Sequence, residues 1–159
     1  MSRQRLRSGG GRRAGDRSPL EELDAIPASS FHTPEERADH ARERARIVHL
    51  LGRSDEAIDE LENALKHRHE LHPASVLRLL IAYAEVASSG GSLVPVQMEP
   101  ILREVVQSLG IPEGDDASRL PVADRIRSTW TRFKEGGRRY ENVTFLATGK
   151  PREEKKRIL

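Results

Sequence analysis

The chain has no cysteine among its 159 residues. This absence excludes a disulfide framework, a thiol nucleophile and every zinc site that needs a cysteine ligand, and it fits a reducing compartment. No apolar run reaches the roughly 18–20 residues that a membrane helix needs, and the N-terminus has no apolar signal segment. We therefore expect a soluble intracellular protein that makes no contact with a membrane.

Aromatic residues are also scarce. They make up 4% of the chain, whereas hydrophobic residues make up 36% and charged residues 33%. A core built from so few apolar side chains must be modest, and part of the chain must lie outside it. The length suits one ordinary domain with tails rather than two full domains.

The net charge of +2 hides an uneven distribution of charged residues. Residues 1–20 carry six Arg against one Asp, and residues 136–159 carry seven Lys or Arg against three Glu. The residues between these ends sum to about −7. Charge blocks inform about partners rather than about fold. An acidic folded centre predicts that any contact with nucleic acid is made by the basic ends.

The first 30 residues are predicted to form a disordered, Arg-rich tail, with order beginning near Phe31. They offer little apolar surface to offset the entropy of ordering. Arginines in such a tail either serve as a nuclear import signal or hold the chain weakly to phosphates, and the alternative is a tail that only keeps the protein soluble. The arginines concerned are Arg3, Arg5, Arg7, Arg12 and Arg13.

Helical periodicity over residues 31–135 predicts an all-α domain, a small bundle of four to five helices. Thr33, Pro34 and Glu36 form a capping-box pattern that locates the first helix, which Gly52 ends. Ser54 is expected to cap the second helix, which continues towards Pro73.

The third helix, over residues 74–87, is apolar on nearly all sides, which predicts that it lies at the centre of the bundle. A fourth helix is expected between Pro95 and Gly110. The last begins within residues 118–121 and ends at a pair of glycines, 136–137. Only residues 142–145 show a strand-like alternation. The predicted core residues are Leu79, Leu80, Ile101, Val105, Ile126 and Trp130.

Three histidines, His67, His69 and His72, are the strongest metal-like pattern. Their spacing is i, i+2 and i+5, whereas two ligands on one helical face need i, i+4. We therefore interpret them as the solvated end of a charged helix. Asp115 and Asp116 lie in a Pro/Gly loop without a nucleophile nearby. The sequence predicts no enzyme, no cofactor and no metal site.

Residues 51–65 resemble the second half of a tetratricopeptide repeat, with Gly52, Ala57, Ala64 and Leu65 at matching positions. No second copy follows at the 34-residue period, and a single repeat cannot bury its own apolar face. The pattern therefore favours a generic helical hairpin.

Residues from about 57 to 135 resemble the N-terminal helical domain of transcription elongation factors of the S-II and elongin A type. That domain has a leucine-rich helix, a Pro-containing turn, a Val-x-x-Leu segment and a last helix with a tryptophan flanked by basic residues. The residues that carry the resemblance are Leu79, Leu80, Val94, Pro95, Val96, Val106, Leu109, Val122, Ala123, Ile126, Trp130, Arg132, Phe133 and Lys134.

Residues 136–159 are predicted to form a second disordered basic tail, which contains Val143-Thr144-Phe145. In an extended strand the valine and phenylalanine side chains lie on the same side. Such a pair can add to a sheet edge while both side chains fill pockets. The segment resembles the Val-x-Phe motif through which regulatory subunits dock on the catalytic subunit of protein phosphatase 1.

The same tail resembles more specifically the docking segment of PNUTS-type nuclear targeting subunits, in which Val-Thr-aromatic is followed by Gly-Lys-x-Arg-Glu. Here that sequence occurs at residues 149–153. Two departures are that Glu141 and Asn142 replace the usual basic residues before Val143, and that residues 154–155 replace a hydrophobic-aromatic pair. The expected docking residues are Val143, Phe145, Arg138, Arg139, Lys150 and Arg152.

This resemblance implies a non-catalytic nuclear scaffold that recruits protein phosphatase 1 to RNA polymerase II transcription and termination. It also implies a WD-repeat adaptor and a chromatin-associated protein as further partners. The alternative is an interaction module of the elongation-factor or tetratricopeptide type, without a phosphatase, whose basic tails hold it to nucleic acid.

Overall fold

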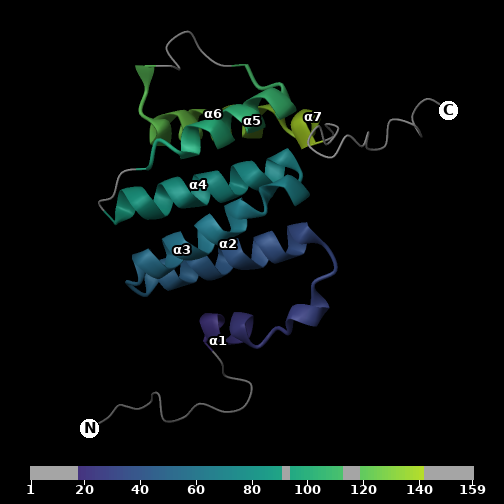
Figure 1. Ribbon diagram of the computed structural model, residues 1–159, viewed down its shortest axis with the longest axis vertical. Helices are drawn as coiled ribbons and strands as arrows, with labels where there is room; N and C mark the ends of the chain where they lie inside the picture. Colours follow the sequence, from purple (N-terminus) through teal and green to yellow (C-terminus); the bar gives the residue numbers. More distant parts are fainter. Residues whose placement is uncertain (1–17, 91–93, 113–118, 142–159) are drawn as a thin grey trace, which may run out of the picture.

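A computed structural model describes residues 18–90, 94–112 and 119–141 of the chain (Figure 1). The fold is all-α, as predicted, and the described residues contain no strand. The helices are α1 (Pro19–Asp24), α2 (Pro34–Leu50), α3 (Ser54–Lys66), α4 (Pro73–Ser89), α5 (Met98–Leu109), α6 (Val122–Gly136) and α7 (Arg138–Glu141). Short 3₁₀ helices occur at Ala28–Ser30 and Arg68–Glu70. The strand-like residues 142–145 lie outside the described part.

The predicted start of the first long helix is confirmed at α2. The Thr33 hydroxyl accepts a hydrogen bond from the Glu36 amide, and the Glu36 side chain bonds back to the Thr33 amide. Gly52, with a φ of 87°, follows the end of the helix, where a left-handed residue closes the turn. The prediction for Ser54 is wrong. It is the first residue of α3, and its hydroxyl is hydrogen-bonded to His49 Nδ1 at 2.8 Å instead of capping the helix.

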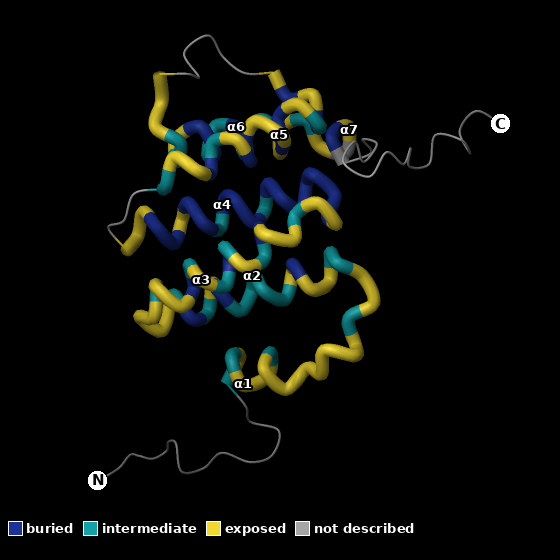
Figure 2. The backbone as a smooth tube through the Cα atoms, viewed as in Figure 1, coloured by how far each residue is buried: buried dark blue, intermediate teal, exposed yellow. Residues whose placement is uncertain are grey.

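Helix α4 is central, as its all-round apolar pattern predicted. It lies between the α2–α3 pair and the α5–α6 pair in Figure 1, and it packs against all four helices. Most of its residues are buried, so the helix is drawn almost entirely in dark blue in Figure 2. A helix with neighbours on most sides has little surface for charged side chains, and α4 carries only two of them, Arg78 and Glu85.

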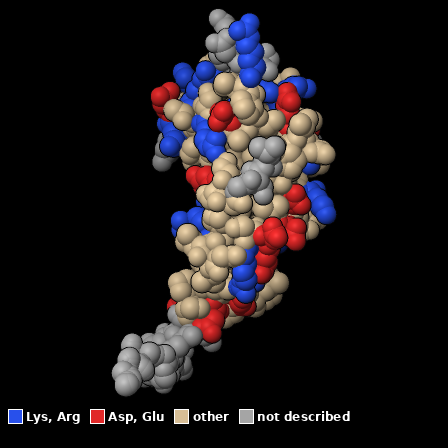
Figure 3. Space-filling view, turned by 90° about the vertical axis from the view of Figure 1, so that its left-hand side faces the viewer, with Lys and Arg blue, Asp and Glu red and all other residues tan. Residues whose placement is uncertain are grey.

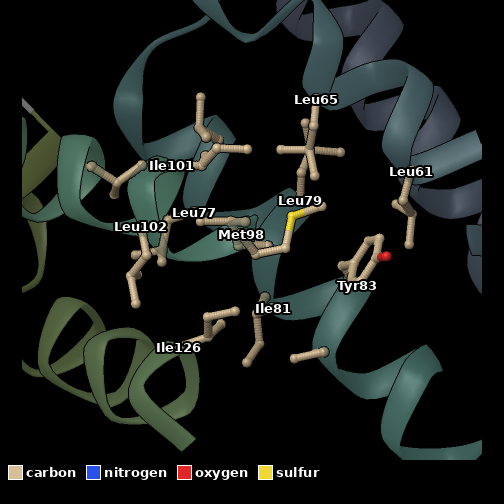
Figure 4. Packing of buried hydrophobic residues seen from close by; sticks show 14 of the residues in the cluster. Leu61, Leu65, Leu77, Leu79, Ile81, Tyr83, Met98, Ile101, Leu102 and Ile126 are labelled. Carbon is tan, nitrogen blue, oxygen red and sulfur yellow. The ribbon is translucent and has the colours of Figure 1, made fainter. Parts of the chain in front are cut away.

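The core combines side chains from both helix pairs around α4 (Figure 4). Five of the six predicted core residues are buried, namely Leu79, Leu80, Ile101, Val105 and Ile126. The sixth, Trp130, is only partly buried and packs against the edge of the cluster. Tyr83 is buried too, and its hydroxyl donates a 2.8 Å hydrogen bond to Glu62, which links α4 to α3. Burial and the Glu62 carboxylate raise the pKa of Tyr83.

The predicted folded domain, residues 31–135, is too short at both ends. Helix α1 begins at Pro19, inside the segment that we expected to be disordered up to residue 30. At the other end, the glycine pair does not end the helical part of the chain, because α7 follows at Arg138–Glu141. The first described helix therefore begins at Pro19 rather than after residue 31, and the last ends at Glu141 rather than at 135. The remaining residues of both predicted tails lie outside the described part.

Candidate functional site

The predicted docking residues fall at the C-terminal end of the described chain and beyond it. Arg138 and Arg139 belong to α7, and Arg139 is exposed. The others, Val143, Phe145, Lys150 and Arg152, lie outside the described residues. The five N-terminal arginines predicted to act as an import signal or tether, Arg3, Arg5, Arg7, Arg12 and Arg13, also lie outside them. The site therefore has to be built from α7 and its neighbours.

A close approach between a glycine and an aromatic ring anchors α7. The Tyr140 ring packs directly on the Cα of Gly136, where a Cβ would collide with the ring. Gly137, with a φ of 60° and a ψ of −141°, turns the chain back after α6 in a conformation that only glycine adopts readily. Tyr140 is thereby 6% exposed, although it is one residue from the end of α7.

Three aromatic rings continue from this anchor into the bundle. The ring centroids of Tyr140 and Phe133 are 6.1 Å apart, and those of Phe133 and Trp130 are 5.6 Å apart. Aromatic pairs at these distances stabilise packing beyond their buried area. Helix α7 is a single turn with few hydrogen bonds of its own. The stack of rings, which reaches α6, therefore holds it on the bundle.

Positive charge surrounds this aromatic stack. The Arg139 guanidinium lies 5.1 Å from the centre of the Tyr140 ring and donates a hydrogen bond to its hydroxyl at 3.2 Å. Lys134 lies 5.7 Å from the Trp130 ring. Cations over aromatic faces are attracted by the negative charge of the ring face. The end of the bundle that leads to the Val-Thr-Phe segment is therefore both apolar and basic.

A concavity of about 300 Å³ lies beside α7. Arg132 lines it and donates a 2.8 Å hydrogen bond to the carbonyl of Pro112, which ties the start of the α5–α6 connection to α6. The lining residues are Pro112, Arg132, Glu135, Gly136, Arg139 and Tyr140.

The charge of the folded part is not evenly acidic. Residues 18–72 carry thirteen Asp or Glu against seven Lys or Arg, whereas residues 119–141 carry seven Lys or Arg against three Asp or Glu. Figure 3 shows most of the Lys and Arg side chains of one face in its upper half. The expected acidic centre is therefore an acidic α1–α3 side together with a basic α6–α7 side. We expected nucleic acid to avoid the whole bundle because of its net negative charge. That negative charge is concentrated on the α1–α3 side.

One arginine of the basic side is buried. Arg125 of α6 donates a 2.7 Å hydrogen bond to Glu99 of α5, with 8% of its side chain exposed. Hydrogen bonding to Arg125, aided by Arg103, holds the pKa of Glu99 below its ordinary value. Arg125 therefore contributes to the α5–α6 contact rather than to the outer basic surface. Sequence reasoning missed this pair because a charged residue in the buried stripe gives no signal of its partner.

The three histidines separate in the structure. His72 is buried and caps α4, with its Nδ1 accepting a 3.0 Å hydrogen bond from the Ala74 amide. His67 and His69 are exposed. In the part of the chain that the structure describes, no group of three or more His, Cys, Asp or Glu is arranged to hold a metal ion. The expectation of a solvated histidine cluster is therefore wrong for His72.

The segment that resembles a tetratricopeptide repeat, residues 51–65, forms the turn and most of the second helix of a hairpin of α2 and α3. A cleft of about 410 Å³ opens between these helices, with Ala38, Ala41 and Ala64 among its lining residues. Arg37 and Glu70 pair across one end of it at 3.8 Å.

Among the helices that the structure describes, none is long and apolar enough to cross a membrane. No family model matches the sequence, and the searches of curated proteins and of solved structures found no similar protein.

Proposed function

We propose that this chain is a non-catalytic scaffold that recruits the catalytic subunit of protein phosphatase 1 to nuclear transcription complexes. One observation supports this best. Tyr140 fixes α7 on Gly136, and Val143 follows the last residue of α7 by only two positions. The Val-Thr-Phe segment thus follows directly after α7, a packed helix with basic residues, and no long linker separates it from the bundle.

The proposed mechanism is recruitment. An extended Val-x-Phe segment adds to the edge of a sheet in the phosphatase, with Val143 and Phe145 filling two neighbouring pockets. Arg138 and Arg139 supply positive charge immediately upstream, in place of the basic residues that usually precede such a motif. Lys150 and Arg152 add charge downstream. Joining the phosphatase to the bundle raises its concentration near whatever the bundle binds.

The bundle supplies the second function of a scaffold. By the resemblance to PNUTS-type subunits, it binds a WD-repeat adaptor and a chromatin-associated protein. The phosphatase would then act on the RNA polymerase II apparatus around termination. The arginines of the N-terminal tail act as an import signal in this proposal, which places the complex in the nucleus.

The docking proposal is tested by pull-down of the phosphatase catalytic subunit with a Val143→Ala, Phe145→Ala double variant. We expect recovery to fall at least about tenfold, because both pocket-filling side chains are removed. Thr144→Ala is the matched control, since its side chain lies on the opposite side of an extended strand and its loss leaves recovery unchanged. Equal recovery of the double variant and the wild type would overturn the proposal.

The charge separation favours a second candidate function. The basic α6–α7 side and both basic tails suit weak, sequence-independent binding of nucleic acid, without a phosphatase. This candidate predicts that polynucleotide affinity falls steeply as salt rises, and that removal of residues 142–159 leaves the main protein partners in place. Loss of those partners on truncation would contradict it.

A further inference from the structure

Two arginines beside α7 differ from most arginines of the described part. Nine others pair with an Asp or Glu carboxylate, as Arg127 does with Asp124 at 3.0 Å. Arg132 and Arg139 pair with no carboxylate among the described residues. Both of them line the concavity of about 300 Å³ beside α7. Two positive charges without a paired carboxylate therefore lie at one recess.

Neutral oxygen atoms hold both guanidinium groups in place. Arg132 donates to the carbonyl of Pro112 at 2.8 Å, and Arg139 donates to the Tyr140 hydroxyl at 3.2 Å. The Tyr140 ring is itself fixed on Gly136. A guanidinium has five N–H donors, so each arginine keeps several donors for another acceptor. Because both groups are positioned before a ligand arrives, little conformational freedom is lost when it binds.

The other groups around the recess leave it with a net positive charge. Among the residues that line it, Glu135 alone carries a carboxylate, which is exposed and pairs with neither arginine. Helix α6 ends at the recess, and the carbonyls at a helix end disfavour anions. The Gly137 amide donates to two of these carbonyls, those of Phe133 and Lys134, which weakens this effect. The two arginines thus outweigh the negative groups around them.

We propose that this recess binds the phosphate group of a phosphorylated serine or threonine in a partner peptide. Such a group carries a charge of about −1.5 to −2 at pH 7 and three acceptor oxygens, and guanidinium groups bind it through paired hydrogen bonds. A concavity of about 300 Å³ suits one small group of this kind.

Nucleic acid fits the recess less well than a phosphorylated peptide does. It presents a row of phosphodiesters, each with a single negative charge, and such a row needs a continuous basic strip. On α6 the basic residues alternate with Asp124 and Glu135, so the strip is interrupted. Two guanidinium groups at one recess match a single phosphate with two charges instead.

The recess is close in sequence to the segment proposed to dock the phosphatase. Arg139 and Tyr140 precede Val143 by four and three residues. Use of the recess as a substrate site rests on the proposed function: a phosphorylated substrate held there lies beside the recruited phosphatase, at a raised local concentration. Binding of the phosphate itself requires no phosphatase.

The test uses the full chain and a fluorescein-labelled peptide that has one phosphoserine among neutral residues. Anisotropy at physiological ionic strength, where distant charges are screened, measures its affinity. We expect the phosphopeptide to bind at least about tenfold more tightly than the same peptide without phosphate, because only the phosphate bonds both guanidinium groups. Equal affinity for the two peptides, or no binding of either, would overturn the proposal.

Substitutions locate the binding at the recess. Arg132→Gln and Arg139→Gln should each lower phosphopeptide affinity about tenfold, because each removes one charge-assisted contact. Arg127→Gln is the matched control on α6, since Arg127 does not line the recess, and it should leave the affinity unchanged. An equal loss in the Arg127 and Arg132 variants would assign the binding to the whole basic side and contradict the proposal.

Glu135→Gln separates a binding role from a loss of folding. Removing the carboxylate of the recess should raise phosphopeptide affinity about threefold, whereas a damaged fold only lowers it. An unchanged or lower affinity would count against a phosphate at this position.

A short oligothymidylate, added at the same concentration as the peptide, is the competitor. We expect the phosphopeptide to remain bound, and its displacement would assign the recess to nucleic acid instead. No phosphatase is present in these measurements. Their failure therefore leaves docking through Val143 and Phe145 intact, and failure of the phosphatase pull-down leaves the phosphate site intact.

Discussion

The two ends of the described chain are attached to the bundle by opposite kinds of contact. Helix α1 buries no residue and is held mainly through Arg44 and His40. Helix α7 is shorter, yet it buries Tyr140 against Gly136 and Phe133. Water or another carboxylate can readily replace Asp24 as a partner of Arg44. The Tyr140 ring, in contrast, fits only where position 136 has no Cβ.

This difference suits the docking proposal made for the C-terminal end. A docking tail benefits from a fixed origin, which Tyr140 provides. Helix α1 depends instead on a partly exposed ion pair between Asp24 and Arg44, and such pairs contribute little to stability. The changes described below break one attachment at a time.

The largest effect is expected from Gly136→Ala. The new Cβ would collide with the Tyr140 ring, so α7 must undock, and we expect the free energy of unfolding to fall by about 2 kcal/mol. Urea denaturation measures this loss. In a Tyr140→Ala background the collision is absent, so the same substitution should cost almost nothing. An equal loss of unfolding free energy in both backgrounds would show that packing of the Tyr140 ring does not require a glycine at position 136.

A smaller effect is expected from Arg44→Met, which keeps most of the aliphatic side chain but removes the link to Asp24 and Glu60. We expect a loss of about 1 kcal/mol, together with faster hydrogen exchange of the α1 amides. Arg46→Met is the matched control on the same helix, because Arg46 is exposed and, among the described residues, pairs only with Glu43. Protected α1 amides in the Arg44 variant would contradict the polar attachment.

The smallest effect is expected from acid, at the start of α2. Hydrogen bonds from the His32 and Thr33 amides hold the pKa of Glu36 below its ordinary value. A lowered carboxyl pKa contributes stability above its ordinary value of 4.5, and this contribution is lost as the pH falls through the lowered pKa. Amide shifts of His32 and Thr33 should therefore move in acid, at a pH below 4.5.

The matched variant for this titration is Glu36→Gln, which keeps the shape of the side chain and removes the ionisation. Its two amides should show no acid transition at all. An acid transition that persists in the Gln variant would assign the effect to another group.

One local pattern shows why prediction from sequence succeeded in one place and failed in another. Thr33-Pro34-x-Glu36 and Ser18-Pro19-x-Glu21 are the same capping box, and both start helices. Only the first is followed by apolar residues at helical spacing, so only the first was predicted. Helix α1 has its cap at Ser18 but lacks a stripe of buried residues. It depends instead on Arg44, which lies twenty residues after its partner Asp24.

At the other end, the glycine pair gave a misleading signal. Two glycines after an apolar helix are typical of a helix end, and α6 does end there. What the pattern does not contain is the position of Tyr140, whose ring fills the space that Gly136 leaves open. A single tyrosine in a charged segment has no periodicity from which to infer burial.

Sequence alone determined where α2 begins, which faces carry the apolar residues and that α4 lies at the centre, because caps and periodicity act between residues close in the chain. Tertiary structure decided which charged groups meet. Arg44 joins α1, α2 and α3, and Arg125 is buried against Glu99, so neither acts as a free surface charge. Contacts of this kind depend on how the helices pack, and packing also divides the folded part into an acidic side and a basic side.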